Sequence, residues 1–220
     1  MNAAGLDYLT WFYETNVWKR LYYRGVRTLK LPLDMWNYQE IIFENDLHWV
    51  VETGTQDGGS ALFFADVLAA ANREGSVVSI DVLHEALSPT VLAHPRIQLL
   101  LGDSGSDSIV QQAMALIPAH RQGGLLLILG SDHEASHVLR ELRAWVPLLR
   151  SGDYLIVEDT IVNGHPVRPE YGPGPLEAIT EYLAQCPDRL QPDFARDEKF
   201  GCSFAARGYF KLGPPREKVQ

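Results

Sequence analysis

Short runs of valine, isoleucine and leucine alternate with amphipathic stretches along the chain from Trp49 onward. Five runs are continuous enough to predict buried strands: WVVET at 49–53, SVVSIDV at 76–82, RIQLLLGDS at 96–104, LLLILG at 125–130 and YLIVEDT at 154–160. Four stretches between and after them predict helices: SALFFADVLAAANR at 60–73, SIVQQAMALI at 108–117, ASHVLRELRAWVPLL at 135–149 and LEAITEYLAQC at 176–186.

This alternation of strands and helices predicts an α/β fold, a Rossmann-like, doubly wound parallel sheet with helices on both faces. The tail FGCSFAARGYFKL at 200–212 predicts a terminal hairpin that turns around Ala205–Gly208. A mostly parallel sheet with a terminal antiparallel strand is typical of class I methyltransferases rather than of dinucleotide dehydrogenases. We expect one compact unit, in which residues 46–220 form the methyltransferase domain and residues 1–45 an N-terminal helical segment.

The N-terminal segment is rich in aromatic residues that we expect near one helical face: Tyr8, Trp11, Phe12, Trp18 and Tyr22. The favoured interpretation is that this face packs on the domain. A substrate lid or a subunit contact is the alternative, and it leads us to expect a homo-oligomer, because large exposed apolar faces usually find a partner. The following stretch, 25–44, predicts a loop and then a helix, with the break at Pro32.

Composition and charge argue against some classes of binding partner. The chain has 28 acidic and 19 basic residues, a formal net charge of −9, which argues against a nucleic acid or an anionic membrane as partner. No signal peptide is expected from the start of the sequence, and the longest strongly apolar stretch, Leu125 to Leu129, is too short to cross a bilayer. Cys186 and Cys202 are expected to be packed thiols, so a cytoplasmic protein is the simplest interpretation.

A glycine-rich segment from Glu52 to Ser60 follows the first predicted strand and opens the first predicted helix. Gly54 and Gly58 let the backbone pass close to a ligand. The segment lacks the G-x-G-x-x-G fingerprint of dinucleotide sites and the Gly-Lys-Ser/Thr end of a phosphate loop. A purely structural turn is the competing interpretation.

Three acids favour a cofactor site. Glu52, Asp81 and Asp103 fall at the carboxyl ends of the first three strands, where open α/β sheets bind ligands. Asp81 is placed to accept both ribose hydroxyls of a nucleoside, Glu52 to meet the ammonium of a methionine moiety, and Asp103 to meet the adenine amine. The neighbouring Ser60 and Ser104 complete the predicted cofactor-binding set.

Two further clusters, Asp132-His133 and Glu158-Asp159, follow the fourth and fifth strands and are expected beside the cofactor. Carboxylates grouped in this way suit Mg²⁺, which makes a bound hydroxyl easier to deprotonate. His133 has the ordinary pKa of a base that takes such a proton. The alternatives are that Asp132 caps the following helix and that Glu158 and Asp159 are solvated loop acids.

Several motifs together resemble the cephalosporin hydroxylase family: TLKLPLDMWNYQEII, VVETGTQDGGSALFFADVL, SDH, YLIVEDTIVNGHPV and YGPGPLEAITEYL. The resemblance runs from about Thr28 to Leu212. It implies a class I O-methyltransferase of antibiotic tailoring that uses S-adenosylmethionine (SAM). It also implies a divalent metal held by Asp132, Glu158 and Asp159, with His133 as base. The family usually has an acid where this chain has Gly130, a departure that concerns the metal site and not the SAM site.

The leading hypothesis is methyl transfer to a hydroxyl of a small-molecule secondary metabolite, including glycosylated ones. A SAM-binding protein repurposed as a non-methylating enzyme or partner subunit is the alternative. A nucleotide-dependent oxidoreductase is disfavoured by the missing dinucleotide fingerprint and by the terminal hairpin.

Overall fold

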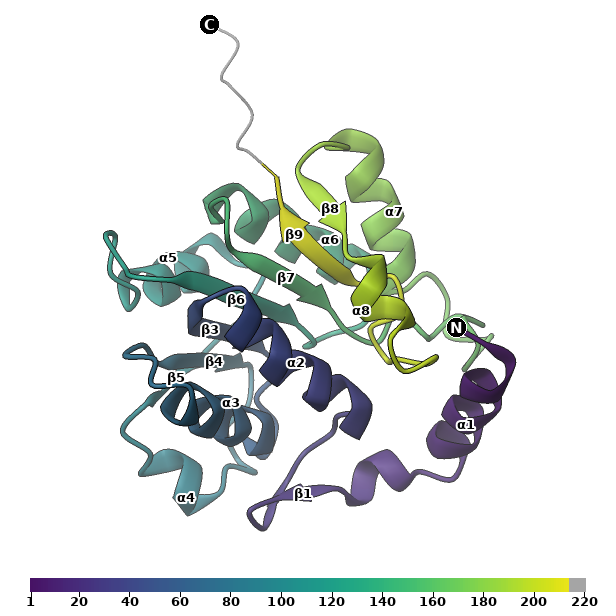
Figure 1. Ribbon diagram of the computed structural model, residues 1–220, viewed down its shortest axis with the longest axis horizontal. Helices are drawn as coiled ribbons and strands as arrows, with labels where there is room; N and C mark the ends of the chain where they lie inside the picture. Colours follow the sequence, from purple (N-terminus) through teal and green to yellow (C-terminus); the bar gives the residue numbers. More distant parts are fainter. Residues whose placement is uncertain (214–220) are drawn as a thin grey trace, which may run out of the picture.

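A twisted seven-stranded sheet forms the centre of the computed structural model, which describes residues 1–213 (Figure 1). Its strand order is β5-β4-β3-β6-β7-β9-β8. The strands are β3 (Leu47–Thr53), β4 (Val77–Asp81), β5 (Ile97–Leu101), β6 (Gly124–Leu129), β7 (Tyr154–Val157), β8 (Leu190–Pro192) and β9 (Tyr209–Leu212). Strands β3 to β7 pair in parallel, and β9 runs antiparallel to both β7 and β8. The predicted sheet is confirmed.

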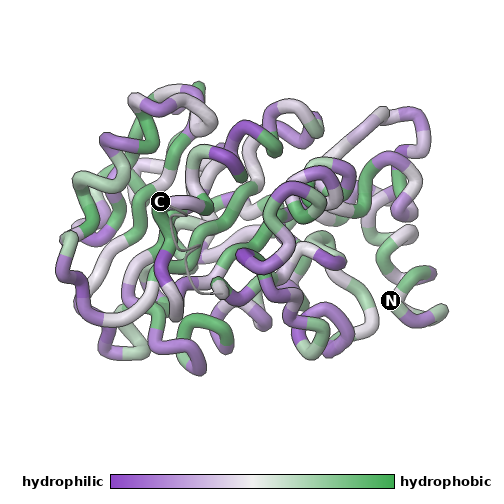
Figure 2. Tube along the Cα trace, turned by 90° about the horizontal axis from the view of Figure 1, so that it is seen from above, coloured by the Kyte–Doolittle hydropathy of each residue, from purple (hydrophilic) through white to green (hydrophobic). Residues whose placement is uncertain are grey.

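Helices cover both faces of this sheet because neighbouring strand residues point to opposite sides. Val50 and Leu126 face α2 (Pro32–Glu44) and α3 (Gly59–Ala70), whereas Val51 and Leu127 face the other helical layer. That layer contains α5 (Asp107–Ala115), α6 (Ala135–Trp145), the short η2 (Val146–Leu148) that follows α6, and α7 (Pro175–Gln185). The short helix α4 (Pro89–Leu92) contacts α3, and Arg196 of α8 (Phe194–Glu198) forms ion pairs with α2. In the hydropathy-coloured trace, green hydrophobic stretches alternate with purple hydrophilic ones, and several green stretches run through the interior (Figure 2).

The N-terminal segment differs from the expected single helical face. The helix α1 (Ala3–Glu14) ends before Asn16, which has a left-handed backbone, and η1 (Val17–Arg20) and the short strands β1 (Tyr22–Tyr23) and β2 (Val26–Arg27) follow. Phe12 is buried, but Trp11 is 53% exposed.

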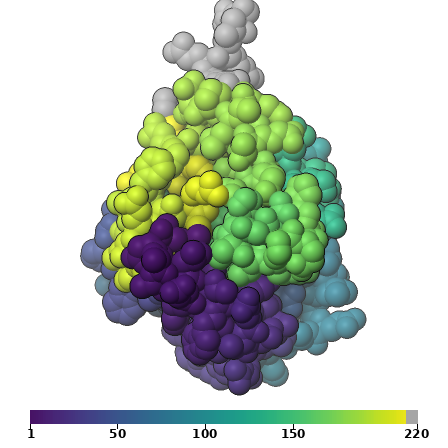
Figure 3. All heavy atoms as spheres, turned by 90° about the vertical axis from the view of Figure 1, so that its right-hand side faces the viewer, coloured from purple at the N-terminus to yellow at the C-terminus, as the bar shows by residue number. Residues whose placement is uncertain are grey.

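The inner face of α1 packs on two segments that are distant in the sequence. Leu9 and Phe12 join a buried cluster with Ile161, Val162 and Phe204. The space-filling view shows this dark purple segment lying against green and yellow parts of the chain (Figure 3). The favoured interpretation of the sequence, packing of this segment on the domain, agrees with this arrangement.

The prediction of a terminal hairpin formed by residues 200–212 is wrong. Ala205–Gly208 does form a turn, closed by the Gly208 N–H to the Ala205 carbonyl at 2.7 Å, but the residues before it form no strand. Asp34 accepts the Phe204 N–H, and the Thr160 hydroxyl donates to the Ala206 carbonyl, so these backbone groups are engaged outside a hairpin. The partner of β9 is β8, which precedes α8.

Other expectations concern single residues and segments. Helix α2 begins at Pro32 as predicted, and Cys186 and Cys202 are both free thiols. Within residues 1–213, no helix is long and apolar enough to cross a membrane.

Candidate active site

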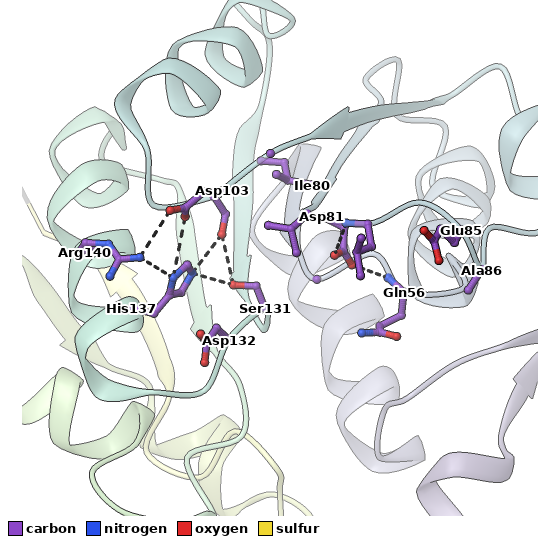
Figure 4. A pocket seen from close by; sticks show the side chains of 15 residues that line it. Gln56, Ile80, Asp81, Glu85, Ala86, Asp103, Ser131, Asp132, His137 and Arg140 are labelled. Carbon is purple, nitrogen blue, oxygen red and sulfur yellow. Dashed lines mark hydrogen bonds and ion pairs between the residues drawn. The ribbon is translucent and has the colours of Figure 1, made fainter.

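A cavity of about 570 Å³ opens at the carboxyl ends of β3, β4, β5 and β6 (Figure 4). Of the predicted site residues, five line it: Gly54, Asp81, Asp103, Ser104 and Asp132. Three predicted cofactor residues do not line this cavity. Ser60 lines a second, smaller cavity beside it, and Glu52 and Gly58 line neither of the two. The sheet thus brings the second and third strand-end acids, Asp81 and Asp103, to one cavity, while the first, Glu52, is fully buried.

Gly54 allows the loop after β3 to lie against the end of β6. Its φ of +90° is in the left-handed region that favours glycine, and a Cβ there would clash with the carbonyl oxygen of Gly130. Any side chain at this position would therefore push apart the two strand ends that border the cavity.

The Asp81 carboxylate is anchored by backbone donors on both sides. Its Oδ2 accepts the Gln56 N–H at 2.9 Å, and its Oδ1 accepts the Leu83 N–H at 3.2 Å. Each oxygen keeps a second lone pair toward the cavity. This arrangement fits a ligand with two neighbouring hydroxyls, such as a ribose.

The opposite wall of the cavity comes from α6, which the sequence analysis did not assign to the site (Figure 4). Buried Glu141 accepts hydrogen bonds from Ser104 at 2.6 Å and from Ser131 at 3.0 Å. A hydrogen bond to Glu141 raises the pKa of His137 above its usual value. Arg140 contacts the His137 ring at 2.9 Å and Asp103 at 3.5 Å. A signal was present in the sequence: His137 and Glu141, one helical turn apart, are polar residues on the otherwise apolar inner face of α6, and Arg140 lies beside them on the exposed side.

A second cavity, of about 240 Å³, adjoins the first. The two share Gly54, Gln56 and Ser131 as lining residues. Tyr13 and Trp18, whose rings stack at 5.6 Å, line the second cavity from the N-terminal segment, and Phe204 lines it from the loop before β9. It is therefore an aromatic chamber connected to the first cavity.

The polar end of the second cavity carries a histidine–carboxylate pair. His133 Nε2 lies 3.1 Å from Asp159 Oδ2. Burial disfavours the imidazolium, but the carboxylates of Asp159 and Glu158 outweigh it and raise the pKa of His133. Burial also opposes ionisation of Asp159, but His133 and Lys30 outweigh it and lower the pKa of Asp159. Since Asp159 holds Nε2, the other ring nitrogen, Nδ1, is left to accept a proton.

Beneath this pair lies a buried cluster of charges. Glu52 is fully buried and accepts a hydrogen bond from Ser79 at 2.9 Å, and burial raises the pKa of Glu52. The Lys30 ammonium lies 3.7 Å from Glu52 and donates to Glu158. Glu52 is thus engaged with protein groups rather than exposed to the first cavity.

The three predicted metal ligands are not gathered. Asp132 lines the first cavity and accepts the Glu134 N–H at 3.0 Å, which makes it a cap of the turn before α6. Glu158 and Asp159 line the second cavity and are held by other side chains. Within residues 1–213, no three His, Cys, Asp or Glu side chains are placed to hold a metal ion. As they are arranged, these residues do not fit a divalent ion.

Comparison with known proteins identifies the fold and the enzyme class. The family described as Rhamnosyl O-methyltransferase/CmcI matches residues 15–212. The chain belongs to this family. A rhamnosyl O-methyltransferase of Mycobacterium leprae (strain TN) is 41% identical over 203 residues, which cover 92% of this chain and 88% of that protein. One of Mycobacterium tuberculosis (strain H37Rv) is 38% identical over 208 residues, 94% of this chain and 84% of that protein.

Solved structures of CmcI are also similar. Its apo-structure superposes with a TM-score of 0.71 at 25% identity, covering 89% of this chain and 77% of that chain. The Mg-SAM form gives a TM-score of 0.67 at 24% identity, with 88% and 77% covered. The predicted cofactors, SAM and magnesium, are those that this CmcI structure holds. The predicted fold, family resemblance and enzyme class, a SAM-dependent O-methyltransferase, are confirmed.

Proposed function

We propose that this enzyme transfers a methyl group from SAM to a hydroxyl of a deoxysugar, of the rhamnosyl class, on a small-molecule natural product. The observation that carries the proposal is the junction of two cavities at Gly54 and Ser131, with His133 on the side of the aromatic chamber. The names of its mycobacterial relatives supply the sugar class.

The first cavity suits the donor. Asp81 would accept the ribose hydroxyls, and the wall built from Asp103, His137 and Arg140 would surround the polar edge of the adenine. No basic phosphate-binding loop borders Gly54, as expected for a nucleoside that carries no phosphate.

The second cavity suits a sugar acceptor. Tyr13, Trp18 and Phe204 offer apolar ring surface, which the C–H faces of a sugar and a deoxysugar methyl group cover without loss of hydrogen bonds. Polar groups at the opposite end, His133 and Asp159, would meet the hydroxyls. The cavity therefore combines an aromatic wall with many polar side chains, Arg27 and Arg168 among them, and a sugar needs both for its C–H faces and its hydroxyls.

In the mechanism, an acceptor hydroxyl oxygen attacks the methyl carbon while the carbon–sulfur bond breaks and its electron pair stays on sulfur. The hydroxyl proton passes to Nδ1 of His133. Asp159 fixes the ring through Nε2 and stabilises the imidazolium that forms, as the geometry at 3.1 Å allows. SAM supplies the electrophilic methyl group, and the chain's own residues orient the acceptor and take up the proton.

Two further parts of the proposal concern the setting of the enzyme. Tyr8 and Trp11, whose ring centroids lie 5.8 Å apart, form an exposed aromatic pair on α1, which supports a homo-oligomer. Both cysteines are unpaired, which supports a cytoplasmic location. Light scattering at micromolar concentration tests the first of these, and a monomer would contradict it.

An acceptor panel tests the function. The enzyme is incubated with SAM and a rhamnosyl glycoside, a matched glucosyl glycoside, or the aglycone, and products are read by mass spectrometry. The proposal expects one added methyl on the rhamnosyl compound and none on the aglycone. Methylation of the aglycone, or SAM binding without methylation of any glycoside, would contradict it.

A further inference from the structure

The most unusual feature of the site is a buried lysine among its acids. Lys30 lies between β2 and α2 and is only 8% exposed. Its ammonium donates to Glu158 Oε2 and lies 3.7 Å from Glu52 Oε1. That Glu52 oxygen is buried and has no hydrogen-bond partner in the described part of the chain. A charge at this depth requires such ionic partners, because burial of an unpaired ammonium is costly.

Glu158 is also held from its other side. The Tyr38 hydroxyl donates to Glu158 Oε1 at 2.7 Å, so both carboxylate oxygens already have a protein partner. Gly130 makes this position available, since a Cβ at residue 130 would collide with Glu158 Oε2. The absence of a side chain at Gly130 and the contact between Lys30 and Glu158 are therefore parts of one arrangement.

This arrangement bears on divalent metal binding. Glu158 and Asp159 are two of the three predicted ligands, and the Lys30 ammonium already forms an ion pair with Glu158. A second, divalent charge beside the ammonium would be repelled, the more strongly because the surroundings are poorly hydrated. A metal ion that used Glu158 would have to displace Lys30.

We propose that Lys30 is a resident cation of the active site, which neutralises Glu158 and competes with divalent metal ions for it. The inference concerns metal binding and does not depend on which sugar is the acceptor. Removal of the charge at position 30 is expected to free Glu158, which lines the second cavity beside Asp159, to bind a divalent ion.

A Mn²⁺ titration of the full chain tests this competition. Bound Mn²⁺ is measured by electron paramagnetic resonance in the presence of S-adenosylhomocysteine. Lys30→Gln, which keeps a hydrogen-bond donor but no charge, is expected to bind Mn²⁺ at least about tenfold more tightly than the wild type. Lys30→Arg, which keeps the charge, is expected to stay near the wild-type affinity. Lys211→Gln is the control, since it removes a lysine whose partner, Asp193, lies outside both cavities.

A third substitution identifies the site. Adding Glu158→Gln to Lys30→Gln is expected to abolish the gain in affinity. Thermal denaturation checks that each variant is folded, and Lys30→Met serves in place of Lys30→Gln should the latter unfold. Equal or weaker Mn²⁺ binding by a folded, uncharged variant at position 30 would overturn the proposal, and so would a gain that survives Glu158→Gln.

Discussion

Replacement of Asp81 is the sharpest probe of the donor cavity. Its carboxylate lies at the end of β4, and backbone N–H groups of Gln56 and Leu83 fix both oxygens toward the cavity. If each oxygen accepts one ribose hydroxyl, two hydrogen bonds to a charged group are lost in Asp81→Ala. Such a bond contributes about 1.5–3 kcal/mol.

The side chain is partly exposed, so water replaces some of what is lost. We therefore take the lower end, about 3 kcal/mol for the pair, which corresponds to about a 100-fold weaker Kd. Asp81→Asn keeps one acceptor oxygen and is expected to weaken binding about tenfold. The same substitutions should leave the affinity for the acceptor unchanged.

Isothermal titration with S-adenosylhomocysteine measures these changes directly. Asp66→Asn is the control, because Asp66 also accepts side-chain hydrogen bonds but lies on α3 outside both cavities. Binding to Asp81→Ala as tight as to the wild type would refute the assignment of the ribose to this end of the sheet.

The remaining predictions concern the walls of the two cavities, the stability of the fold and the catalytic base. Gly54→Ala should lose S-adenosylhomocysteine binding in calorimetry, whereas Gly152→Ala, with a similar φ but open space around it, should only lower the melting temperature. Asp34→Ala should lower the free energy of unfolding in urea by about 2–5 kcal/mol, because it leaves the buried Phe204 N–H without its acceptor and removes one of the two partners of the buried Tyr209 hydroxyl; a loss below about 1 kcal/mol would count against this. Trp18→Ala should raise the acceptor KM about tenfold with donor affinity unchanged, and a changed donor Kd instead would argue against the assigned chamber. Turnover should fall as the pH drops through the raised pKa of His133, which must be neutral to act as base, so the acid limb should lie at higher pH than for an ordinary histidine; a flat profile would argue against this role.

The parallel strands were predictable because each is a continuous apolar run, and β3, β4, β6 and β7 lie buried between two helical layers, whereas β5 at the edge is half-buried. The terminal hairpin was not, because the partner of β9 is a three-residue strand, Leu190–Pro192, with little hydrophobic signal of its own. The N-terminal aromatic residues were misplaced for a different reason. Their helical spacing is interrupted at Asn16, whose left-handed backbone no periodicity reveals.

The site, like the fold, could be predicted from the sequence only in part. Strand-end acids such as Asp81 could be located because parallel strands end at one edge of a sheet. Spacing along the chain could not show that Lys30, from a loop far from Glu158 in the sequence, would occupy that carboxylate. Nor could it show that Asp132 faces the other cavity from Glu158, since this depends on how each loop turns after its strand.

The central claim is that methyl transfer occurs where the two cavities meet, with His133 taking the acceptor proton. Single-turnover transfer from enzyme loaded with deuterated-methyl SAM to a rhamnosyl glycoside, in wild type and His133→Gln, tests it most directly. We predict methyl transfer in the wild type and a rate about 10²–10⁴-fold lower in the variant, with donor binding unchanged. Equal rates in the two proteins, or no labelled methyl on the sugar, would contradict the account.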